Sequence, residues 1–423
     1  MPTHLYTAPA GGGKTAYAVA EARRYAEGLR ATPHVLVASA LQAQAFRRRL
    51  AEAGGAIGVR VLTFEELYRI CLAATDRVYT EVGEAVQYRI VRSVVRQLPL
   101  THYASLTDRP GFVEVLKGVI DELKAARVHP DGFTQAVSEH GAAARLQELA
   151  DIHAAYQARL QAEGWADPAG LGWRAVEALE EDDNQMGEAW PVLLVEGFDD
   201  FTPVQLAVLA LVARRVERTV ITMTGGIDGR ERSLVHRRFD RTLHELVETM
   251  GVEPAPLPDR ASTRAAVLTH LEDGLFQSEA PCLPGQGTVE LVEAANRAGE
   301  VRAALRWLKR EVVERKLSPD QLALLTRDVK PYAPLIDQVA AEFGLPVHIY
   351  AGRPVEENPA VAALINLLRL MLPVERAGIA QMDENGLTAE TGGAEPALPP
   401  RLVIDAWRSP YFDWSIPPVA GDG

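Results

Sequence analysis

The first seventy residues alternate between short apolar runs and longer segments whose apolar residues recur at helical spacing. Residues 15–29 and 41–55 place Ala, Val, Leu and Phe on one side and charged residues on the other, which predicts two amphipathic helices. Runs of strand length occur around these helices and again later in the chain, at 3–8, 34–39, 59–64, 191–201 and 218–226. Because strands that alternate with helices form a parallel, doubly wound sheet, the pattern predicts an α/β fold.

The pattern changes character twice in the rest of the chain. Residues 80–180 carry helical patterns throughout, so we expect a helical insertion in the sheet domain. After a loose stretch at 251–262, strand-like runs at 288–296, 322–327 and 345–350 predict a second α/β unit, and the polar residues 375–400 predict a linker. The expected organisation is a sheet domain of residues 1–80 and 185–285, a helical insertion of residues 81–184, the start of a second domain at 286–373, and a linker with the start of a further insertion at 374–423.

Composition narrows the class of protein. A chain of 423 residues with 47% hydrophobic and 24% charged residues is typical of a soluble protein with several domains. No run approaches about 20 apolar residues and no secretory signal is recognisable, so we expect a cytoplasmic protein that does not span a membrane. Cys71 and Cys282 form neither a metal pattern nor a disulfide framework. The net charge of −13 argues against a protein coated in nucleic acid but leaves room for a local basic groove.

A glycine-rich loop follows the first predicted strand, in "LYTAPAGGGKT" (5–15). It follows the phosphate-binding P-loop pattern, with Ala8 at the position of the first glycine. The predicted ATP-binding residues are Ala8, Pro9, Ala10, Gly11, Gly12, Gly13, Lys14 and Thr15. Glycines let backbone N–H groups curl around phosphate oxygens, Lys14 would reach the β- and γ-phosphates, and Thr15 would bind Mg²⁺. A flexible N-terminal tip is the alternative, but the strand before the loop and the helix after it favour a nucleotide site.

A P-loop protein also needs an acidic residue at the end of another buried strand to hold Mg²⁺. In "VLLVEGFDDFTPVQ" (192–205), Glu196 stands at that position. Gly197 follows it, where hydrolysing enzymes of this kind commonly have a Glu that polarises the attacking water. Asp199 and Asp200 lie too far along the chain for a general base, and they belong either to a solvated turn or to a metal-related site. The sequence thus predicts ATP and Mg²⁺ binding and leaves hydrolysis in doubt.

The ordered set of motifs resembles a superfamily 1 helicase of the UvrD/RecB type and, more narrowly, the N-terminal half of the AddB family of helicase–nuclease subunits in bacterial double-strand-break repair. The resembling stretches are "APAGGGKT", "VLVASALQAQAFRRRL", "VLTFEELY", "VEGFDDFTPVQ", "VITMTGG", the segment from Leu322 to Met371, and "WRSPYFDW". The "EGF" followed by "FTP.Q" is the most specific of these. The resemblance covers nearly the whole chain, although residues 80–180 match by position only.

This resemblance implies a RecA-like P-loop domain with a helical insertion, followed by part of a second RecA-like domain. It implies ATP between the two domains, single-stranded DNA across them, and an AddA-type partner subunit. Full-length members carry a nuclease domain and often an iron–sulfur cluster, and neither occurs within these 423 residues. In AddB-type subunits, loss of the motif II Glu goes with a motor that scans DNA or serves as a scaffold. Arg327 matches an arginine that reaches the γ-phosphate, although without the family it would be an ordinary salt-bridge arginine. The role of Gln205 in motif II stays open.

Candidate DNA contacts follow the ends of the second and third strands. They are Ser39, Thr63 and Phe64, with Gln42 nearby, and Arg48 within the basic run Arg47–Arg49; another basic run lies at 229–241. Single-strand binding combines such positive charge with aromatic platforms. The alternatives are a core position for Phe64 and a solvated helix face for the arginines.

Three functions are compatible with the P-loop. The first is an ATP-binding subunit of a DNA repair helicase/nuclease that binds single-stranded DNA and hydrolyses ATP weakly or not at all. The second is an active DNA-dependent ATPase or translocase, and the third is a P-loop kinase or switch unrelated to DNA. Only the first two account for "EGFDDFTPVQ" and the second α/β unit. Gly197 separates them, because a hydrolysing motor needs a Glu there.

Overall fold

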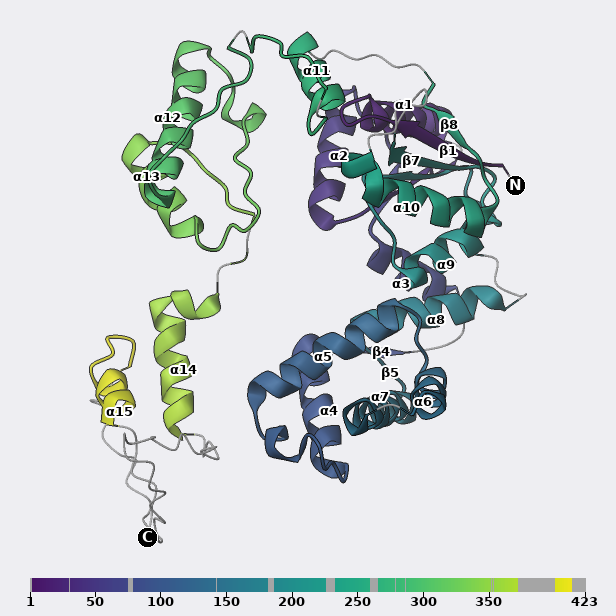
Figure 1. The fold of residues 1–423 in the computed structure, drawn as a ribbon, viewed down its shortest axis with the longest axis vertical. Helices are drawn as coiled ribbons and strands as arrows, with labels where there is room; N and C mark the ends of the chain where they lie inside the picture. The colour runs from purple at the N-terminus through teal and green to yellow at the C-terminus, as the bar shows by residue number, and fades with distance from the viewer. Residues whose placement is uncertain are drawn as a thin grey trace. The chain divides into compact units, whose positions relative to one another are not determined.

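The computed structural model divides the chain into two compact units, residues 1–288 and 289–423 (Figure 1). The structure describes residues 2–29, 31–74, 79–141, 143–181, 186–225, 233–258, 265–277, 279–285, 287–350, 352, 354–371 and 400–412. The predicted linker at 375–400 lies outside these residues except for its last position. Each unit is described by itself below.

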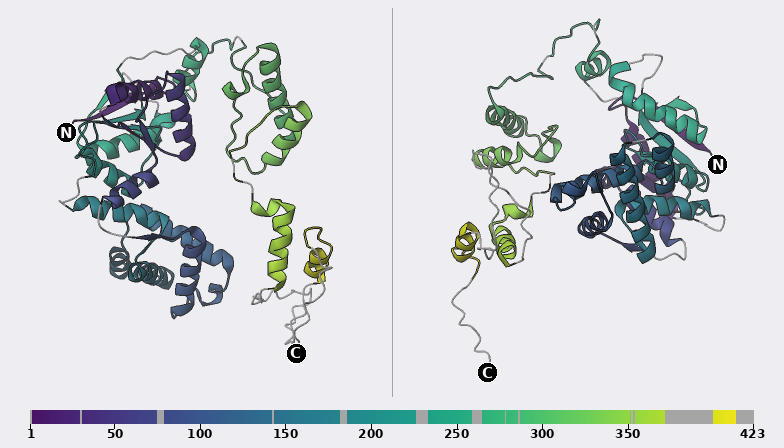
Figure 2. Two further views of the ribbon diagram at one scale, coloured as in Figure 1. Left: turned by 180° about the vertical axis from the view of Figure 1, so that it is seen from behind. Right: turned by 60° about the horizontal axis from the view of Figure 1, so that its bottom comes forward.

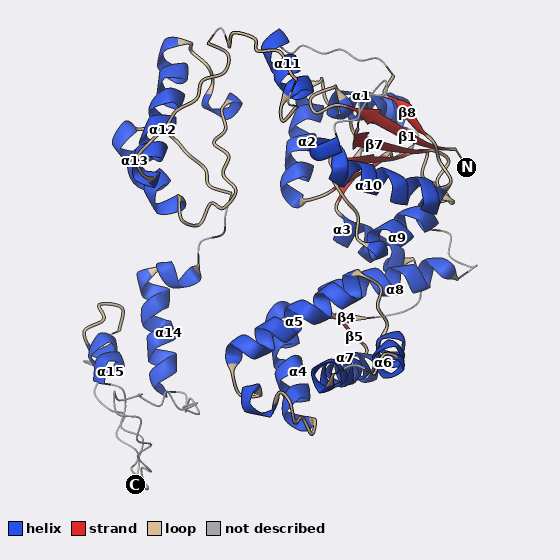
Figure 3. Ribbon diagram, viewed as in Figure 1, coloured by secondary structure: helices blue, strands red, loops and turns tan. Residues whose placement is uncertain are grey.

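A six-stranded parallel sheet forms the centre of the first unit, with strand order β3-β2-β6-β7-β1-β8 (red in Figure 3). Its strands are β1 (Thr3–Ala8), β2 (His34–Val37), β3 (Arg60–Leu62), β6 (Leu193–Glu196), β7 (Thr219–Thr224) and β8 (Pro254–Pro256). The α/β fold class is confirmed, and the sheet is that of a RecA-like domain. Five of the six strands fall within the runs expected from the sequence.

Helices cover both faces of this sheet, which explains why β2 and β6 are apolar at consecutive positions rather than at alternate ones. On one face, α1 (Lys14–Ala26) and α2 (Ala40–Glu52) pack on Val35, Val37 and Leu194. On the other, Leu36, Leu193 and Val195 belong to a second core formed with α3 (Phe64–Ala73), α8 (Pro168–Glu180), α9 (Pro203–Ala213) and α10 (Ser233–Met250). The unit also contains η1 (Glu27–Leu29) and α11 (Ala266–Gly274).

Strand β8 is the one strand of this sheet that the sequence pattern did not predict. The stretch 251–262 was expected to be a loose connection because it contains several prolines. In the structure, Pro254 and Pro256 occupy alternate positions of an edge strand paired with β1, and Leu257 N–H, directly after them, donates to Thr7 O at 2.9 Å. A proline is tolerated at an edge where its missing N–H would face away from the neighbouring strand.

The helical insertion consists of α4 (Glu84–Gln97), η2 (Ala104–Leu106), α5 (Pro110–Ala125), α6 (Pro130–Glu139), α7 (Ala144–Glu163) and α8. A two-stranded ladder of β4 (Thr80–Glu81) and β5 (Trp165–Ala166) closes its base. The helical insertion also contains a fully buried ion pair, in which Lys124 Nζ donates to both carboxylate oxygens of Asp167 at 2.7 and 2.8 Å. The Tyr156 hydroxyl donates to the same carboxylate at 2.6 Å, so this cluster ties α5, α7 and α8 together.

In the second unit, α12 (Arg297–Glu314) packs on α13 (Ala333–Phe343) through Val301, Leu305, Ile336, Val339 and Ala340. The two helices lie side by side in both views of Figure 2. Asn296 caps α12 by accepting a hydrogen bond from Gly299 N at 2.9 Å. The unit also contains η3 (Pro319–Gln321), η4 (Val355–Glu357), α14 (Pro359–Met371) and α15 (Pro400–Trp407).

The prediction of strands at 288–296, 322–327 and 345–350 is wrong for this structure. The described residues of these segments form no strand ladder. Leu291 and Leu325 are 99% and 89% exposed, so these apolar side chains have no neighbouring layer to pack against. Apolar alternation favours a strand, but a strand exists only when a second one pairs with it.

Candidate functional site

The polar residues singled out in the first unit gather at one edge of the sheet. Strands β1, β2, β3 and β6 are parallel, so their carboxyl ends meet at the same edge. The P-loop follows β1, Ser39 follows β2, Thr63 follows β3 and Glu196 ends β6. In open α/β sheets this is the edge at which ligands bind.

The three glycines of the loop are each required by its geometry. Gly11 and Gly13 have φ values of 62° and 92°, in the left-handed region that side chains disfavour. At Gly12 a Cβ atom would lie 3.0 Å from Pro9 O and 3.1 Å from Ala8 Cβ. The loop leads into the N-terminus of α1, which has no side-chain cap and whose dipole favours an anion. This arrangement fits a phosphate group.

The lysine and threonine of the loop sit where the motif requires them. Lys14 Nζ donates to Ala8 O at 3.1 Å and to Pro9 O at 3.0 Å, so its ammonium group lies over the loop itself. The Thr15 hydroxyl donates to Glu196 Oε1 at 2.5 Å, across 181 positions of sequence. Thr15 and Glu196 would together offer Mg²⁺ a hydroxyl and a carboxylate oxygen, and oxygen atoms are the ligands that this ion prefers. Within the described residues, no group of three or more His, Cys, Asp or Glu side chains is arranged to hold a metal ion.

Gly197, next to this acid, is held in a conformation that a side chain would disturb. Its φ is 82°, and a Cβ atom there would lie 2.9 Å from Gln42 Oε1. Gln42 clamps two strand ends together, since its Oε1 accepts from Ala38 N at 3.0 Å and its Nε2 donates to Gly197 O at 3.1 Å. The Gln42 side chain therefore fills the space that a Glu side chain at position 197 would need.

The acidic turn after Gly197 contacts α10 through Asp199. Asp199 Oδ2 accepts from Arg238 at 2.7 Å, with both side chains more than half exposed, and Asp199 O accepts from the Thr242 hydroxyl at 3.0 Å. Asp199 thus joins the turn to α10. Arg238 belongs to the basic run at 229–241, of which 229–232 lie outside the described residues; no local signal connects it to an aspartate 39 positions earlier.

Gln205, whose role the sequence left open, has a structural function. Its side chain accepts from Thr202 N at 3.0 Å, and the Thr202 hydroxyl accepts from Gln205 N at 3.3 Å. This reciprocal pair is the capping box that starts α9.

Ser39 and Thr63 begin the helices that leave the edge. Ser39 Oγ accepts from Gln42 N at 3.2 Å, and Thr63 forms a capping box with Glu66, whose Oε2 accepts from Thr63 N at 2.7 Å. Both residues keep their places beside the P-loop edge. Phe64 is only 6% exposed and packs edge-on against Phe198 and Phe201, so its ring offers no free face for a base. The core interpretation of Phe64 is the one that the structure supports.

The arginine run on α2 divides between two roles. Arg47 donates to Val61 O at 2.8 Å and so fixes the helix to β3. Arg48 is 53% exposed and pairs with Glu52 on the same helix at 2.9 Å. Arg327 lies exposed in the second unit, outside any helix or strand, and its role toward a nucleotide stays a prediction.

Comparison with known proteins places the chain in a family. Residues 5–272 match the sequence model of a family described as "ADDB, N-terminal", which is more than half of the chain. The chain belongs to the AddB family. Relatives named as ATP-dependent helicase/deoxyribonuclease subunits of the B type include those of Symbiobacterium thermophilum, 29% identical over 350 residues, and Moorella thermoacetica, 30% identical over 409 residues. These alignments cover 76% and 88% of this chain, and the resemblance noted in the sequence is confirmed.

The chain spans only part of the length of these AddB relatives, 29% and 34% in the two cases. The P-loop, Ser39, Thr63 and Glu196 all lie within residues 5–272, which match the family model, whereas Arg327 lies beyond these residues. Among the described helices, none combines the length and apolar character that a membrane crossing needs.

Proposed function

We propose that this chain is the nucleotide-binding N-terminal portion of an AddB-type subunit of a bacterial DNA repair helicase/nuclease. It binds ATP·Mg²⁺ at the P-loop, contacts single-stranded DNA at the carboxyl edge of the sheet, hydrolyses ATP weakly or not at all, and works with an AddA-type partner subunit. In this proposal residues 1–80 and 185–285 form the first motor domain and 81–184 its helical insertion. Residues 286–373 begin the second motor domain, and 374–423 provide a linker and the start of a further insertion.

The observation that carries the nucleotide assignment is the contact between Thr15 and Glu196. The sequence separates these residues by 181 positions, yet the fold brings their oxygens to 2.5 Å beside an uncapped helix N-terminus. A phosphate cradle next to a hydroxyl–carboxylate pair is what ATP·Mg²⁺ requires. Lys14 would hold the β- and γ-phosphates, and Thr15 with Glu196 would hold the Mg²⁺ that neutralises their charge.

The proposal of weak hydrolysis rests on the residues next to Glu196, where a water that attacks the γ-phosphate would need a general base. Gly197 supplies no carboxylate, and Asp199 is engaged by Arg238. A general base must lie within hydrogen-bond reach of the water that it activates. The alternative, an active translocase, needs a carboxylate in the place where this chain has Gly197.

The DNA assignment rests on position and on charge. Ser39 and Thr63 directly follow β2 and β3 on the edge that also carries the P-loop, whereas Arg48 lies exposed in the later half of α2. Hydroxyl and guanidinium groups are common phosphate contacts. Phe64 takes no part because its ring is buried. Contacts to phosphate make binding salt-dependent and independent of sequence.

Calorimetry of ATP·Mg²⁺ binding tests the central claim. Lys14→Ala should abolish the binding heat, because the β- and γ-phosphates lose their cation. Lys309→Ala is the matched control: it removes the same charge from α12 and should bind as the parent does. Equal affinity of parent and Lys14→Ala would refute the nucleotide site. DNA-stimulated phosphate release at ordinary motor rates, on the order of 1–100 s⁻¹, would instead favour the translocase.

A further inference from the structure

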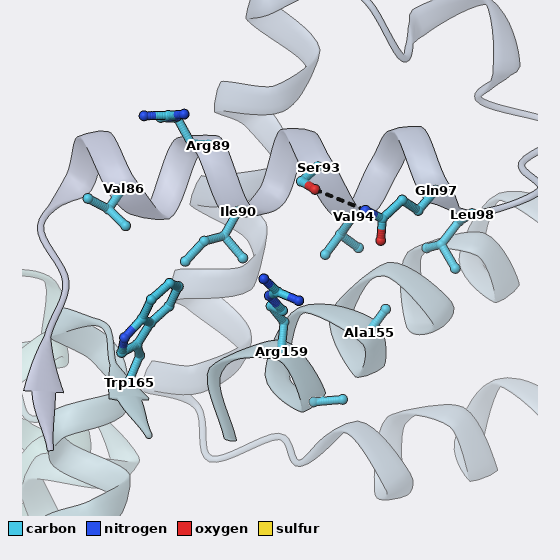
Figure 4. Close-up of a pocket in the computed structure, with 11 residues that line it drawn as sticks. Val86, Arg89, Ile90, Ser93, Val94, Gln97, Leu98, Ala155, Arg159 and Trp165 are labelled. Carbon is cyan, nitrogen blue, oxygen red and sulfur yellow. Dashed lines mark hydrogen bonds between the residues drawn. The ribbon is translucent and has the colours of Figure 1, made fainter. Parts of the chain in front are cut away.

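The helical insertion carries a groove that the P-loop chemistry does not use. It has a volume of about 650 Å³ and runs between α4 and α7 (Figure 4). Val86, Ile90, Val94 and Leu98 form an apolar wall along α4 and its C-terminal end, Ala155 faces them from α7, and Trp165 closes one end. Val86 is 41% exposed, so part of this wall is open to a ligand.

A second hollow of about 330 Å³ extends the groove along the outer face of α4. The two hollows share Arg89, Ser93 and Gln97, and the second adds Arg92 and Arg96. The two hollows therefore adjoin along α4, and we call them together the α4 groove.

Among the residues that the structure describes, every polar side chain that lines the α4 groove can donate a hydrogen bond, and none of the lining residues is Asp or Glu. Arg89, Arg92 and Arg96 follow one another at spacings of three and four residues on a single helix, so they share one face and span about 10 Å of helix axis. A solvated helix face normally mixes both signs of charge, and this one stands out in a chain of net charge −13.

Two of these arginines are available to a ligand. Arg96 pairs with Asp108 at 2.8 Å, and Arg159, on the α7 side, pairs with Glu163 at 3.1 Å. Arg89 and Arg92 form no ion pair with any other residue in the described part of the chain. The groove thus presents two uncompensated guanidinium groups beside Ser93 and Gln97.

We propose that the α4 groove binds the sugar–phosphate backbone of a single nucleic-acid strand, with Trp165 as a platform for a base. A row of guanidinium groups suits successive phosphates better than one compact anion. An apolar wall and an indole ring beside the arginines suit an unpaired strand, whose bases can reach the ring, rather than a duplex. The proposal rests on the function proposed above only for naming the strand as DNA, and it concerns a contact separate from the sheet edge.

Fluorescence anisotropy of the whole chain with a labelled oligothymidylate tests this site. Arg89→Gln/Arg92→Gln should weaken binding about tenfold and lower the slope of log affinity against log salt by ~1.4, the loss of two single-strand phosphate contacts. Arg109→Gln/Arg145→Gln is the matched control: it removes the same charge from exposed positions of the same insertion that do not line the groove. It should bind within about twofold of the parent. Hydrogen exchange should show α4 protected by the oligonucleotide in the parent and in this control, but not in Arg89→Gln/Arg92→Gln.

Each other outcome is decisive. Parent-like binding by Arg89→Gln/Arg92→Gln, with protection confined to the sheet edge, overturns the α4 groove and leaves the proposed function standing. Tighter binding of a blunt duplex overturns the single-strand assignment. If polyglutamate displaces the oligonucleotide from the parent but not from Arg89→Gln/Arg92→Gln, the groove binds an acidic protein segment instead. No binding of any oligonucleotide by the parent overturns both proposals.

Discussion

At the scale of single residues, Gly197 limits what the nucleotide site can do. We predict that Gly197→Glu does not produce DNA-stimulated ATP hydrolysis, although it introduces the residue type that hydrolysing P-loop enzymes commonly carry at this position. A side chain at φ 82° is strained by about 1–2 kcal/mol, and it must also displace the Gln42 side chain. Phosphate-release assays and a melting curve check this.

Gly58→Glu is the control for that substitution. Gly58 has a φ of 88°, but a Cβ atom added there would meet nothing within 4 Å, so the substitution carries the backbone strain without the clash. Gly197→Glu should therefore melt at a lower temperature than Gly58→Glu. If Gly197→Glu is as stable as this control and hydrolyses ATP, the Gln42 side chain can move aside at little cost, and the prediction is wrong.

Phe64 is a second residue whose role can be measured directly. Phe64→Ala should lower the free energy of unfolding by about 3–5 kcal/mol, because it empties a packed site between three aromatic rings. Affinity for single-stranded DNA, measured well below the melting temperature, should stay unchanged. Phe276→Ala, at a residue 75% exposed, should affect neither quantity appreciably. Loss of DNA affinity without loss of stability in Phe64→Ala would restore the stacking role.

At the scale of elements, one carboxylate of α7 holds the loop between α4 and α5. Glu148 accepts hydrogen bonds from the N–H groups of Thr101, His102 and Tyr103 and from the Thr101 hydroxyl, at 2.7 to 3.0 Å. Burial alone would raise the pKa of the Glu148 carboxyl, but these four donors outweigh it and lower the pKa to about 2.

This depressed pKa predicts an acid-dependent loss of stability. The folded carboxyl has the lower pKa, so its contribution is complete above the ordinary pKa of 4.5 and is lost as the pH falls toward 2. Glu148→Gln should be less stable than the parent at neutral pH and should lose less stability as the pH is lowered from the ordinary carboxyl pKa of 4.5 to about 2. Glu52→Gln, at an exposed carboxyl on α2, serves as the control. Parallel curves of stability against pH for the parent and Glu148→Gln would contradict the stabilising role of the Glu148 carboxylate.

At the scale of the whole molecule, the first unit contains the six-stranded sheet, the P-loop pair and the helical insertion. Its three core clusters use no residue beyond position 288. We predict that residues 1–288 fold cooperatively when expressed alone and bind ATP·Mg²⁺. Circular dichroism and calorimetry check this, with Lys14→Ala in the same fragment as the control. Loss of ATP binding in a folded fragment would show that residues such as Arg327 are required.

Local pattern was enough to predict five of the six strands of the first unit and to single out candidate residues for its nucleotide site. Strands β1, β2, β3, β6 and β7 were recognisable because buried strands are apolar over several consecutive residues. The loop from Gly11 to Thr15 was recognisable because phosphate binding needs those residue types in one short stretch. Glu196 followed from its place at the end of an apolar run. Each of these depends on near neighbours in sequence.

Contacts between distant segments were decided only by the tertiary structure. Two prolines could form β8 because they fall at the open side of an edge, and three apolar runs of the second unit formed no ladder because none pairs with another among the described residues. Phe64 became a core residue, Gln42 closed over Gly197, and Asp199 paired with Arg238. The sequence determined which segments can be strands, helices and phosphate loops, since these depend on local backbone and side-chain chemistry. The fold alone decided which side chains meet, because burial and hydrogen bonding depend on neighbours in space.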